Sequence, residues 1–246
     1  MLYASLFSTL CFLLSSLGAS MVFFIRNISS KTQAFLHAFS SGVMIASSIF
    51  SLLIPAIEYC KELSLKDYII LPLSFVFAYL VLIVLDLLNK ENNNTKINTK
   101  LVSLGMCLHN IPEGMCVGFA FASASILGTQ SAFVSAVMIA LGIGIQNIPE
   151  GMSVAFPKVC SGCSRLKSFF TGLLMAVVEI PAGIIAYLIG LEFIFILPYM
   201  LAFSSAIMIF VSCLDLMPEA VHNNKKIALL SLFLGFILMM TLDLAL

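Results

Sequence analysis

The chain has 246 residues, of which 61% are hydrophobic and only 10% are charged. Soluble domains carry about 25% charged residues, so this composition excludes a soluble fold and predicts a protein embedded in a lipid bilayer. The 12 basic and 12 acidic residues balance, which leaves no basic surface for binding nucleic acid.

Apolar runs of spanning length recur along the whole chain. One crossing takes about 20 apolar residues, so we expect an all-α, polytopic membrane protein with eight transmembrane helices in one integral domain, residues 1–246. The first run lacks a basic segment before it, which favours a retained helix over a cleaved signal peptide. Residues 89–100, NKENNNTKINTK, are expected to form a flexible polar loop. The runs cover residues 2–25, 34–57, 68–88, 101–124, 131–156, 168–190, 194–217 and 227–246.

The basic residues separate onto alternate connections between these runs. Ten of the 12 lie in the first, third, fifth and seventh connections, and only Lys61 and Lys66 lie in the others. Cytoplasmic loops of membrane proteins carry the excess of lysine and arginine, so this pattern predicts a cytoplasmic 89–100 loop and extracytoplasmic termini. The pattern leaves open whether the host is the plasma membrane or an internal membrane.

Two segments of the chain are repeated. Residues 109–119, HNIPEGMCVGF, match residues 146–156, QNIPEGMSVAF, and these copies lie in the fourth and fifth runs. A weaker echo relates residues 39–45, FSSGVMI, in the second run to residues 203–209, FSSAIMI, in the seventh. Each pair is an odd number of crossings apart, so the copies would lie inverted in the membrane. Inverted internal repeats are typical of secondary transporters, whose substrate site lies near the midplane.

Three carboxylates, Glu113, Glu150 and Glu179, fall inside apolar runs. A charged group near the centre of a spanning helix costs about 2.5 to 3.5 kcal/mol, so each one calls for a partner or a function. Each lies within two residues of a proline, which removes a backbone donor and should loosen the helix. Carbonyl groups freed in this way could face a bound cation. The loosened turns are expected around Leu108, Ile145 and Val177.

Polar residues accompany two of these carboxylates at helical spacing. His109 and Asn110 lie four and three residues before Glu113, which places all three on one face of the fourth helix. Imidazole, carboxylate and amide ligands suit Zn²⁺ and would also accept Fe²⁺, Mn²⁺ or Cd²⁺. So many ligands leave room for two adjacent metals or for one that is loosely held. The matching face of the fifth helix carries Gln146, Asn147 and Glu150.

The doubled motif, together with EIPAG at Glu179 and FSSGVMIASSIFSLLIPAIE in the second run, resembles the ZIP (Zrt/Irt-like) family of metal transporters, in particular its GufA-like branch. The resemblance covers essentially the whole chain. It implies eight helices, extracytoplasmic termini, import of a divalent metal ion, most often zinc, toward the cytosol, and often a homodimer. The metal would be the transported substrate, and no prosthetic group is implied.

The resemblance also implies a binuclear metal site between the fourth, fifth and sixth helices. Met44 corresponds to a family position that can touch the metal. Gln146 stands where many members have histidine, which predicts weaker binding of a second metal. The residues that correspond to the family's site are His109, Asn110, Glu113, Gln146, Asn147, Glu150 and Glu179.

Two weaker metal-ligand patterns occur outside this motif. Cys160 and Cys163 have the spacing of a metal or redox pair, but one such pair without a second is a weak signal. Glu219 and His222 have the ExxH spacing of di-iron sites, yet those sites use the motif twice. A solvated helix end is the simpler interpretation of that pair.

Two other functions compete with transport. A bound Zn²⁺ could activate water in an intramembrane metalloenzyme, but the chain has no HExxH, GxSxG or paired-aspartate hydrolase motif. A receptor or scaffold without transport would leave three buried carboxylates unexplained. We therefore expect a transporter and not an enzyme.

Overall fold

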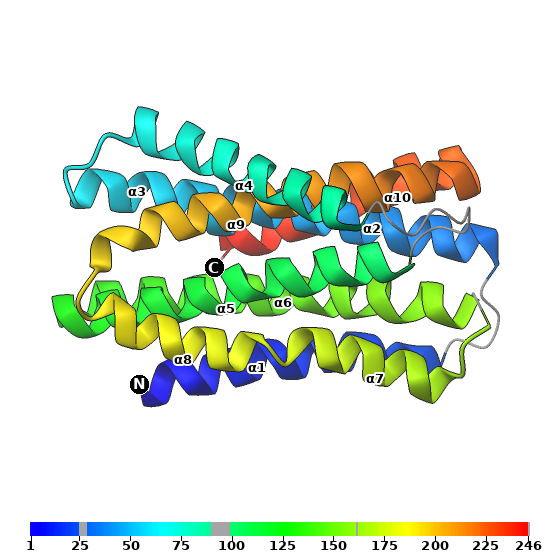
Figure 1. Ribbon diagram of the computed structural model, residues 1–246, viewed down its shortest axis with the longest axis horizontal. Coiled ribbons are helices and arrows are strands. Elements are labelled where there is room, and N and C mark those ends of the chain that lie inside the picture. The colour runs from blue at the N-terminus through cyan, green and yellow to red at the C-terminus, as the bar shows by residue number, and fades with distance from the viewer. Residues whose placement is uncertain (25–28, 90–98, 161, 246) are drawn as a thin grey trace.

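A computed structural model describes residues 1–24, 29–89, 99–160 and 162–245, without the side chains of residues 85–86, 88–89, 99–109, 157, 160 and 194. Every regular element in these ranges is a helix (Figure 1). The expected 89–100 loop lies mostly outside the described residues. The elements are α1 Leu2–Ser20, η1 Met21–Phe23, α2 Ser30–Ser47, η2 Ser48–Leu53, α3 Ile54–Glu62, α4 Asp67–Asn89, α5 Thr99–Leu127, α6 Gln130–Cys160, α7 Arg165–Ala176, α8 Glu179–Gly190, η3 Ile194–Ile196, α9 Leu197–Val211, η4 Ser212–Leu216 and α10 Met217–Ala245.

Six stretches of the described residues are long and apolar enough to cross a membrane. One of them, Leu197–Ala245, contains a break at Asn224, whose backbone is not helical. Polar capping residues extend some helices beyond the apolar runs. The Ser29 hydroxyl accepts a hydrogen bond from the Thr32 N–H at 3.2 Å, so α2 begins at Ser30, four residues before the run expected from hydropathy. The chain is thus an all-helical, multi-pass membrane protein.

The helices form two groups that meet along one seam. Helices α1, α5, α6, α7 and α8 make the first group, and α2, α3, α4, α9 and α10 make the second (Figure 1). The closest pairs within the groups are α1 with α6, α5 with α8, and α2 with α10. We call the contact of α5 and α6 with α2 and α9 the seam. The second motif copy contacts both groups, since Gln146 of α6 reaches Met208 of α9 across the seam and Asn147 of α6 reaches Glu179 of α8.

Glycines bring the paired helices into backbone contact. A Cβ atom at Gly118 of α5 would lie 2.1 Å from the Gly183 carbonyl oxygen of α8, and one at Gly42 of α2 would lie 2.1 Å from the Leu232 carbonyl oxygen of α10. Lipid tails are as apolar as the helix surfaces, so helices in membranes associate through such close packing at small residues. Each group is therefore tightly packed internally.

Proline interrupts the helices at only one of the three expected places. The chain breaks between α7 and α8, where Pro181 cannot donate to the Val177 carbonyl, as predicted. In contrast, α5 continues through Pro112 and α6 through Pro149, so the expected loosening around Leu108 and Ile145 was wrong. Both helices pack closely against α8 and α1, and these contacts hold them together across one missing hydrogen bond.

Two other prolines coincide with widened turns that the sequence did not reveal. The π-helical segment η2 precedes Pro55, and the π-helical segment η4 precedes Pro218. A wider turn accommodates a proline that cannot donate to the carbonyl four residues before it. Each segment begins three residues after one copy of the weaker repeat, which ends at Ile45 or at Ile209.

These widened turns are held by matching hydrogen bonds. The Ser205 hydroxyl of α9 donates to the carbonyl oxygen of Ser48, the first residue of η2, at 2.9 Å. The Ser41 hydroxyl of α2 donates to the carbonyl oxygen of Ser212, the first residue of η4, at 3.3 Å. Ser41 corresponds to Ser205 in the repeat, and Ser48 corresponds to Ser212. Equivalent positions thus exchange equivalent bonds.

Candidate metal centre

Three buried carboxylates converge where α5, α6 and α8 meet. Glu113 and Glu179 are fully buried and Glu150 is 2% exposed. Each is close enough to the other two for their negative charges to repel one another. The buried side chains of the described residues include no lysine or arginine that could offset this repulsion. A cation placed among the carboxylates would relieve it.

Two adjacent amides of α6 bind two different carboxylates. The Gln146 side-chain nitrogen donates to Glu113 Oε1 at 2.7 Å, and the Asn147 side-chain nitrogen donates to Glu179 Oε2 at 3.0 Å. The second motif copy therefore reaches both neighbouring helices. The Asn110 side-chain nitrogen does not bind a carboxylate in this way. It donates to the Met175 carbonyl oxygen of α7 at 3.0 Å.

Five buried oxygens of these side chains have no hydrogen-bond partner among the described residues. Leaving one such atom unsatisfied costs about 1 to 3 kcal/mol, so a group of five is unusual in one small region. Carboxylate and amide oxygens are also ligands of divalent cations. The arrangement fits a site that is completed by an ion. The five atoms are Asn110 Oδ1, Glu113 Oε2, Gln146 Oε1, Asn147 Oδ1 and Glu179 Oε1.

The expected site residues are only partly brought together. His109 lies in α5, but its side chain is outside the described residues. Within the part of the chain that the structure describes, no three histidine, cysteine or carboxylate side chains gather tightly enough to hold one ion. The described ligand candidates are therefore carboxylates supplemented by amide oxygens, rather than a preformed cage of strong ligands.

A methionine beside this site was missed in the sequence, whereas the predicted contact of Met44 with the metal stays a prediction. Met208 is fully buried on α9, and its sulfur accepts a hydrogen bond from the Gln146 side-chain nitrogen at 3.5 Å. The same nitrogen binds Glu113, so an amide N–H group bridges a carboxylate and a thioether. Met208 is the repeat counterpart of Met44, which is also fully buried. The weaker echo was the signal that could have pointed to it.

The glycine of the NIPEG motif explains how Glu179 reaches the site. A Cβ atom at Gly114 would lie 2.4 Å from the Glu179 carbonyl oxygen, so only glycine allows α8 to begin directly beside Glu113. The equivalent Gly151 lies equally close to α1, where a Cβ atom would be 2.1 Å from the Ser15 carbonyl oxygen. Glu179 is also the first residue of α8, where the helix dipole favours a negative charge.

The two weaker patterns do not form sites of their own. Glu219 faces His37 of α2, whereas His222 is exposed. Cys163 is a free, half-buried cysteine, and the side chain of Cys160 lies outside the described residues.

Comparison with known sequences identifies the family. The family model described as "ZIP Zinc transporter" matches residues 88–243, which include both NIPEG copies, Glu179 and the whole of α9 and η4. The chain belongs to the ZIP family. The zinc transporter ZIPB of Bordetella bronchiseptica is 30% identical over 259 residues, which cover 99% of this ZIP chain and 81% of the relative.

Other relatives share shorter or weaker similarity with this ZIP chain. The zinc transporter GufA of Myxococcus xanthus is 32% identical over 94% of both chains. The zinc transporter ZIP11 of Bos taurus is 43% identical over 147 residues, which are 59% of this chain. The chain therefore spans less than half of the ZIP11 sequence that it matches, 43% of its length.

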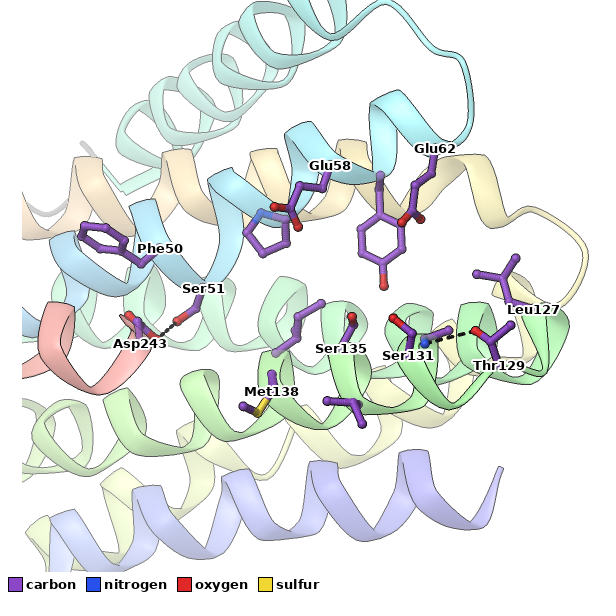
Figure 2. A pocket seen from close by; sticks show the side chains of 15 residues that line it. Phe50, Ser51, Glu58, Glu62, Leu127, Thr129, Ser131, Ser135, Met138 and Asp243 are labelled. Atoms are coloured by element: carbon purple, nitrogen blue, oxygen red, sulfur yellow. Dashed lines mark hydrogen bonds between the residues drawn. The ribbon is translucent and has the colours of Figure 1, made fainter. Parts of the chain in front are cut away.

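An acidic pocket of about 300 Å³ lies at the end of the helix bundle where α3 ends. Figure 2 shows Glu58 and Glu62 of α3 on one wall, with Ser131 and Ser135 of α6 opposite them. The residues described as lining it include no lysine, arginine or histidine. The pocket thus lies between the two groups of helices and presents negative charge.

The inner end of the pocket is formed by the end of α10. Asp243 lines the pocket there and accepts a hydrogen bond from the Ser51 hydroxyl at 2.6 Å (Figure 2). Ser51 belongs to the widened turn η2 and lies two helical turns from Met44. η2 continues α2, whose Ser40 contacts the carbonyl oxygen of Pro149, the residue before Glu150.

Proposed function

We propose that this chain carries divalent metal ions, zinc first among them, across a membrane toward the cytosol. The observation that carries the proposal is a group of five buried oxygens without a partner among the described residues, two of which belong to the three buried carboxylates. The family and the names of its zinc-transporting relatives agree with it. The chemistry of the ligands, carboxylate and amide oxygens with the Met208 thioether nearby, would also admit Cd²⁺, Fe²⁺ and Mn²⁺.

Uptake into proteoliposomes tests this function directly. Purified protein in sealed vesicles should accumulate radioactive zinc in a saturable manner, and unlabelled Cd²⁺, Fe²⁺ and Mn²⁺ should reduce that uptake to different extents. Vesicles without protein are the control for leakage. Absence of uptake by folded protein, with both orientations present in the vesicles, would contradict transport.

The proposed topology has eight crossings, inverted repeats and extracytoplasmic termini. Two features support the count, since α5 alone is 29 residues long and the 49-residue stretch Leu197–Ala245 is divided at Asn224. The exchanged bonds of Ser41 and Ser205 are what an approximate two-fold axis would produce. The turns after α3, α5 and α8 lie at one end of the molecule (Figure 1), which agrees with the alternation of basic residues. A homodimer is part of the same proposal.

We propose that the metal ion enters from the extracytoplasmic side through the acidic pocket. Clefts of one charge attract oppositely charged ions and raise their local concentration. Replacing both Glu58 and Glu62 with glutamine should raise the KM for zinc about threefold to tenfold with little change in the maximal rate, and the difference should shrink in high salt. Glu192→Gln, an exposed carboxylate outside the pocket, is the matched control. A lower maximal rate with unchanged KM would contradict this role.

The ion would leave toward the cytosol when the first group of helices shifts against the second. Hydrogen bonds that cross the seam include Ser153 Oγ to Ser40 Oγ at 2.7 Å and Ser40 Oγ to the Pro149 carbonyl oxygen at 2.6 Å. A shift must break these bonds, while the glycine-packed pairs within each group move together.

A disulfide across the seam tests this movement. In a protein freed of its native cysteines, Ser40→Cys and Ser153→Cys would place two thiols within reach of each other. Oxidation should stop zinc uptake, and reduction should restore it. Each single cysteine variant should transport under both conditions. Full transport by the cross-linked protein would exclude relative motion at this point of the seam.

Acid should inhibit transport. A carboxylate binds metal only when it is deprotonated, so protons compete with the ion for Glu113, Glu150 and Glu179. Under a fixed zinc gradient, uptake should therefore fall several-fold as the pH drops through the titration range of the site. The measurement is the initial rate of uptake at several pH values with ionic strength held constant. A rate that does not change with pH would contradict ion binding by ionised carboxylates.

A further inference from the structure

A buried histidine and a carboxylate face each other at the end of the seam opposite the acidic pocket. His37 of α2 is 3% exposed, and its Nε2 lies 3.7 Å from Oε1 of Glu219 on α10. Glu219 is 24% exposed, so the pair has one side in the protein and one side toward solvent. His37 Nδ1 is buried without a hydrogen-bond partner among the described residues. Among the residues that the structure describes, neither ring nitrogen has a hydrogen bond of ordinary length.

The separation of the pair fits a shared metal ion better than a direct bond. An N–H···O hydrogen bond has a donor–acceptor distance of about 2.7 to 3.2 Å, which is shorter than the 3.7 Å found here. Two ligands that each lie about 2.0 to 2.2 Å from one tetrahedral Zn²⁺ are about 3.4 Å apart. We propose that His37 and Glu219 form a second metal-binding site for a divalent transition-metal ion, separate from the carboxylates of α5, α6 and α8.

A further carboxylate lies near Glu219, but it does not gather with the pair tightly enough to be a third ligand. Asp215 precedes Glu219 by one helical turn, is half-buried, and lies close enough for its charge to act on that of Glu219. It belongs to the widened turn η4, between Glu219 and the buried serines of the seam. Imidazole nitrogen with carboxylate oxygen is a ligand set that suits Zn²⁺ and related ions. With water as the remaining ligand, such a site binds weakly and can release its ion.

The position of the site suggests what it does, if the chain transports metal as proposed. His37 and Met44 lie seven residues apart on α2, which is two helical turns or about 10 Å. Between them, Ser40 contacts the carbonyl oxygen of Pro149, the residue before Glu150. The pair lies at the end of α2 that the basic residues predict to be cytoplasmic. It would receive the ion after it leaves the buried carboxylates.

The chain contains only three histidines, His37, His109 and His222, so their roles can be separated completely. A background variant with Glu113→Gln, Glu150→Gln, His109→Gln and His222→Gln removes the central ligands and leaves His37 as its sole imidazole. Purified in detergent, this variant should retain about one weakly bound zinc per chain in equilibrium dialysis. The X-ray absorption spectrum of that zinc should show scattering from one imidazole.

Adding His37→Gln to this background should weaken zinc binding at least tenfold and remove the imidazole signal. Glu219→Gln should weaken binding while the imidazole signal of the remaining zinc persists, which keeps the test valid if His37→Gln does not fold. Restoring His222 should change nothing, since it is exposed and is the matched control for the ExxH pattern. Absence of bound zinc in the background variant, or equal binding after His37→Gln, would overturn the proposal. Binding is measured without transport, so a failure of uptake would bear on the proposed function alone.

Discussion

Glu113→Gln and Glu150→Gln are each expected to reduce zinc uptake by roughly 100-fold or more. Loss of a residue that merely supports a metal ligand costs about 10- to 100-fold in affinity or activity, and loss of a charged ligand itself should cost at least as much. Glutamine keeps the shape of the side chain, and an amide oxygen at position 113 can still accept the hydrogen bond from Gln146. The fold should therefore survive while the charge is lost.

Thermal unfolding separates this loss of binding from a loss of structure. Without metal, either variant should unfold at the same temperature as the original protein or at a higher one, because one of three repelling carboxylates is gone. An ion that binds only the folded state stabilises it by about 2.7 kcal/mol at 100 times its Kd, so zinc should raise the unfolding temperature of the original protein. The variants should lose that shift, and the exposed control Glu192→Gln should keep it. Normal uptake by either variant would exclude the carboxylate as a ligand.

Gly114→Ala is expected to abolish most of the zinc-dependent stabilisation and to lower uptake about tenfold or more. The new methyl group would meet the Glu179 carbonyl oxygen at 2.4 Å and its Cα at 2.8 Å, so α8 must move away from α5. Overpacking of this kind costs about 1 to 3 kcal/mol and displaces the backbone that carries Glu179. A displacement of about 1 Å is enough to spoil the geometry of a binding site.

The matched control is Gly144→Ala on α6. There the new methyl group would meet only the end of the flexible Leu14 side chain at 2.8 Å, which can rotate aside. This variant should bind zinc and transport it almost as the original protein does. The measurements are the free energy of unfolding, the zinc-dependent shift and the uptake rate for both variants. Equal behaviour of the two alanine variants would show that the close approach of α8 to α5 does not position Glu179.

The class of the protein and most residues of its candidate site could be proposed from the sequence. Its low charge content and apolar runs are properties of composition, and an ionisable group within such a run is costly enough to mark a function by itself. The repeated NIPEG motif identified Glu113 and Glu150. Their polar neighbours could be found from local spacing alone, because residues three and four apart share a helix face. Glu179 was singled out as a carboxylate inside an apolar run, and Pro181 close to it predicted the break at Val177.

Helix continuity was less predictable, because a proline has different effects in different surroundings. Pro112 and Pro149 have the same local sequence signal as Pro181, yet only Pro181 coincides with a break. The prolines at positions 55 and 218 are accommodated by widened turns that bond to serines of another helix. Whether a helix tolerates a lost hydrogen bond depends on what packs against it, and local sequence does not contain that information.

The sequence by itself determined that the chain lies in a membrane, that it is helical, and which carboxylates and amides mark its candidate centre. Only the tertiary structure decided which groups meet: Gln146 with Glu113 and Met208, Asn147 with Glu179, and His37 with Glu219, which lie far apart in the chain. The physical reason is that hydropathy and helical spacing act within a few turns. Contacts between helices depend instead on how closely two helices approach each other at small residues such as glycine. The periodic pattern of a sequence does not specify these distances.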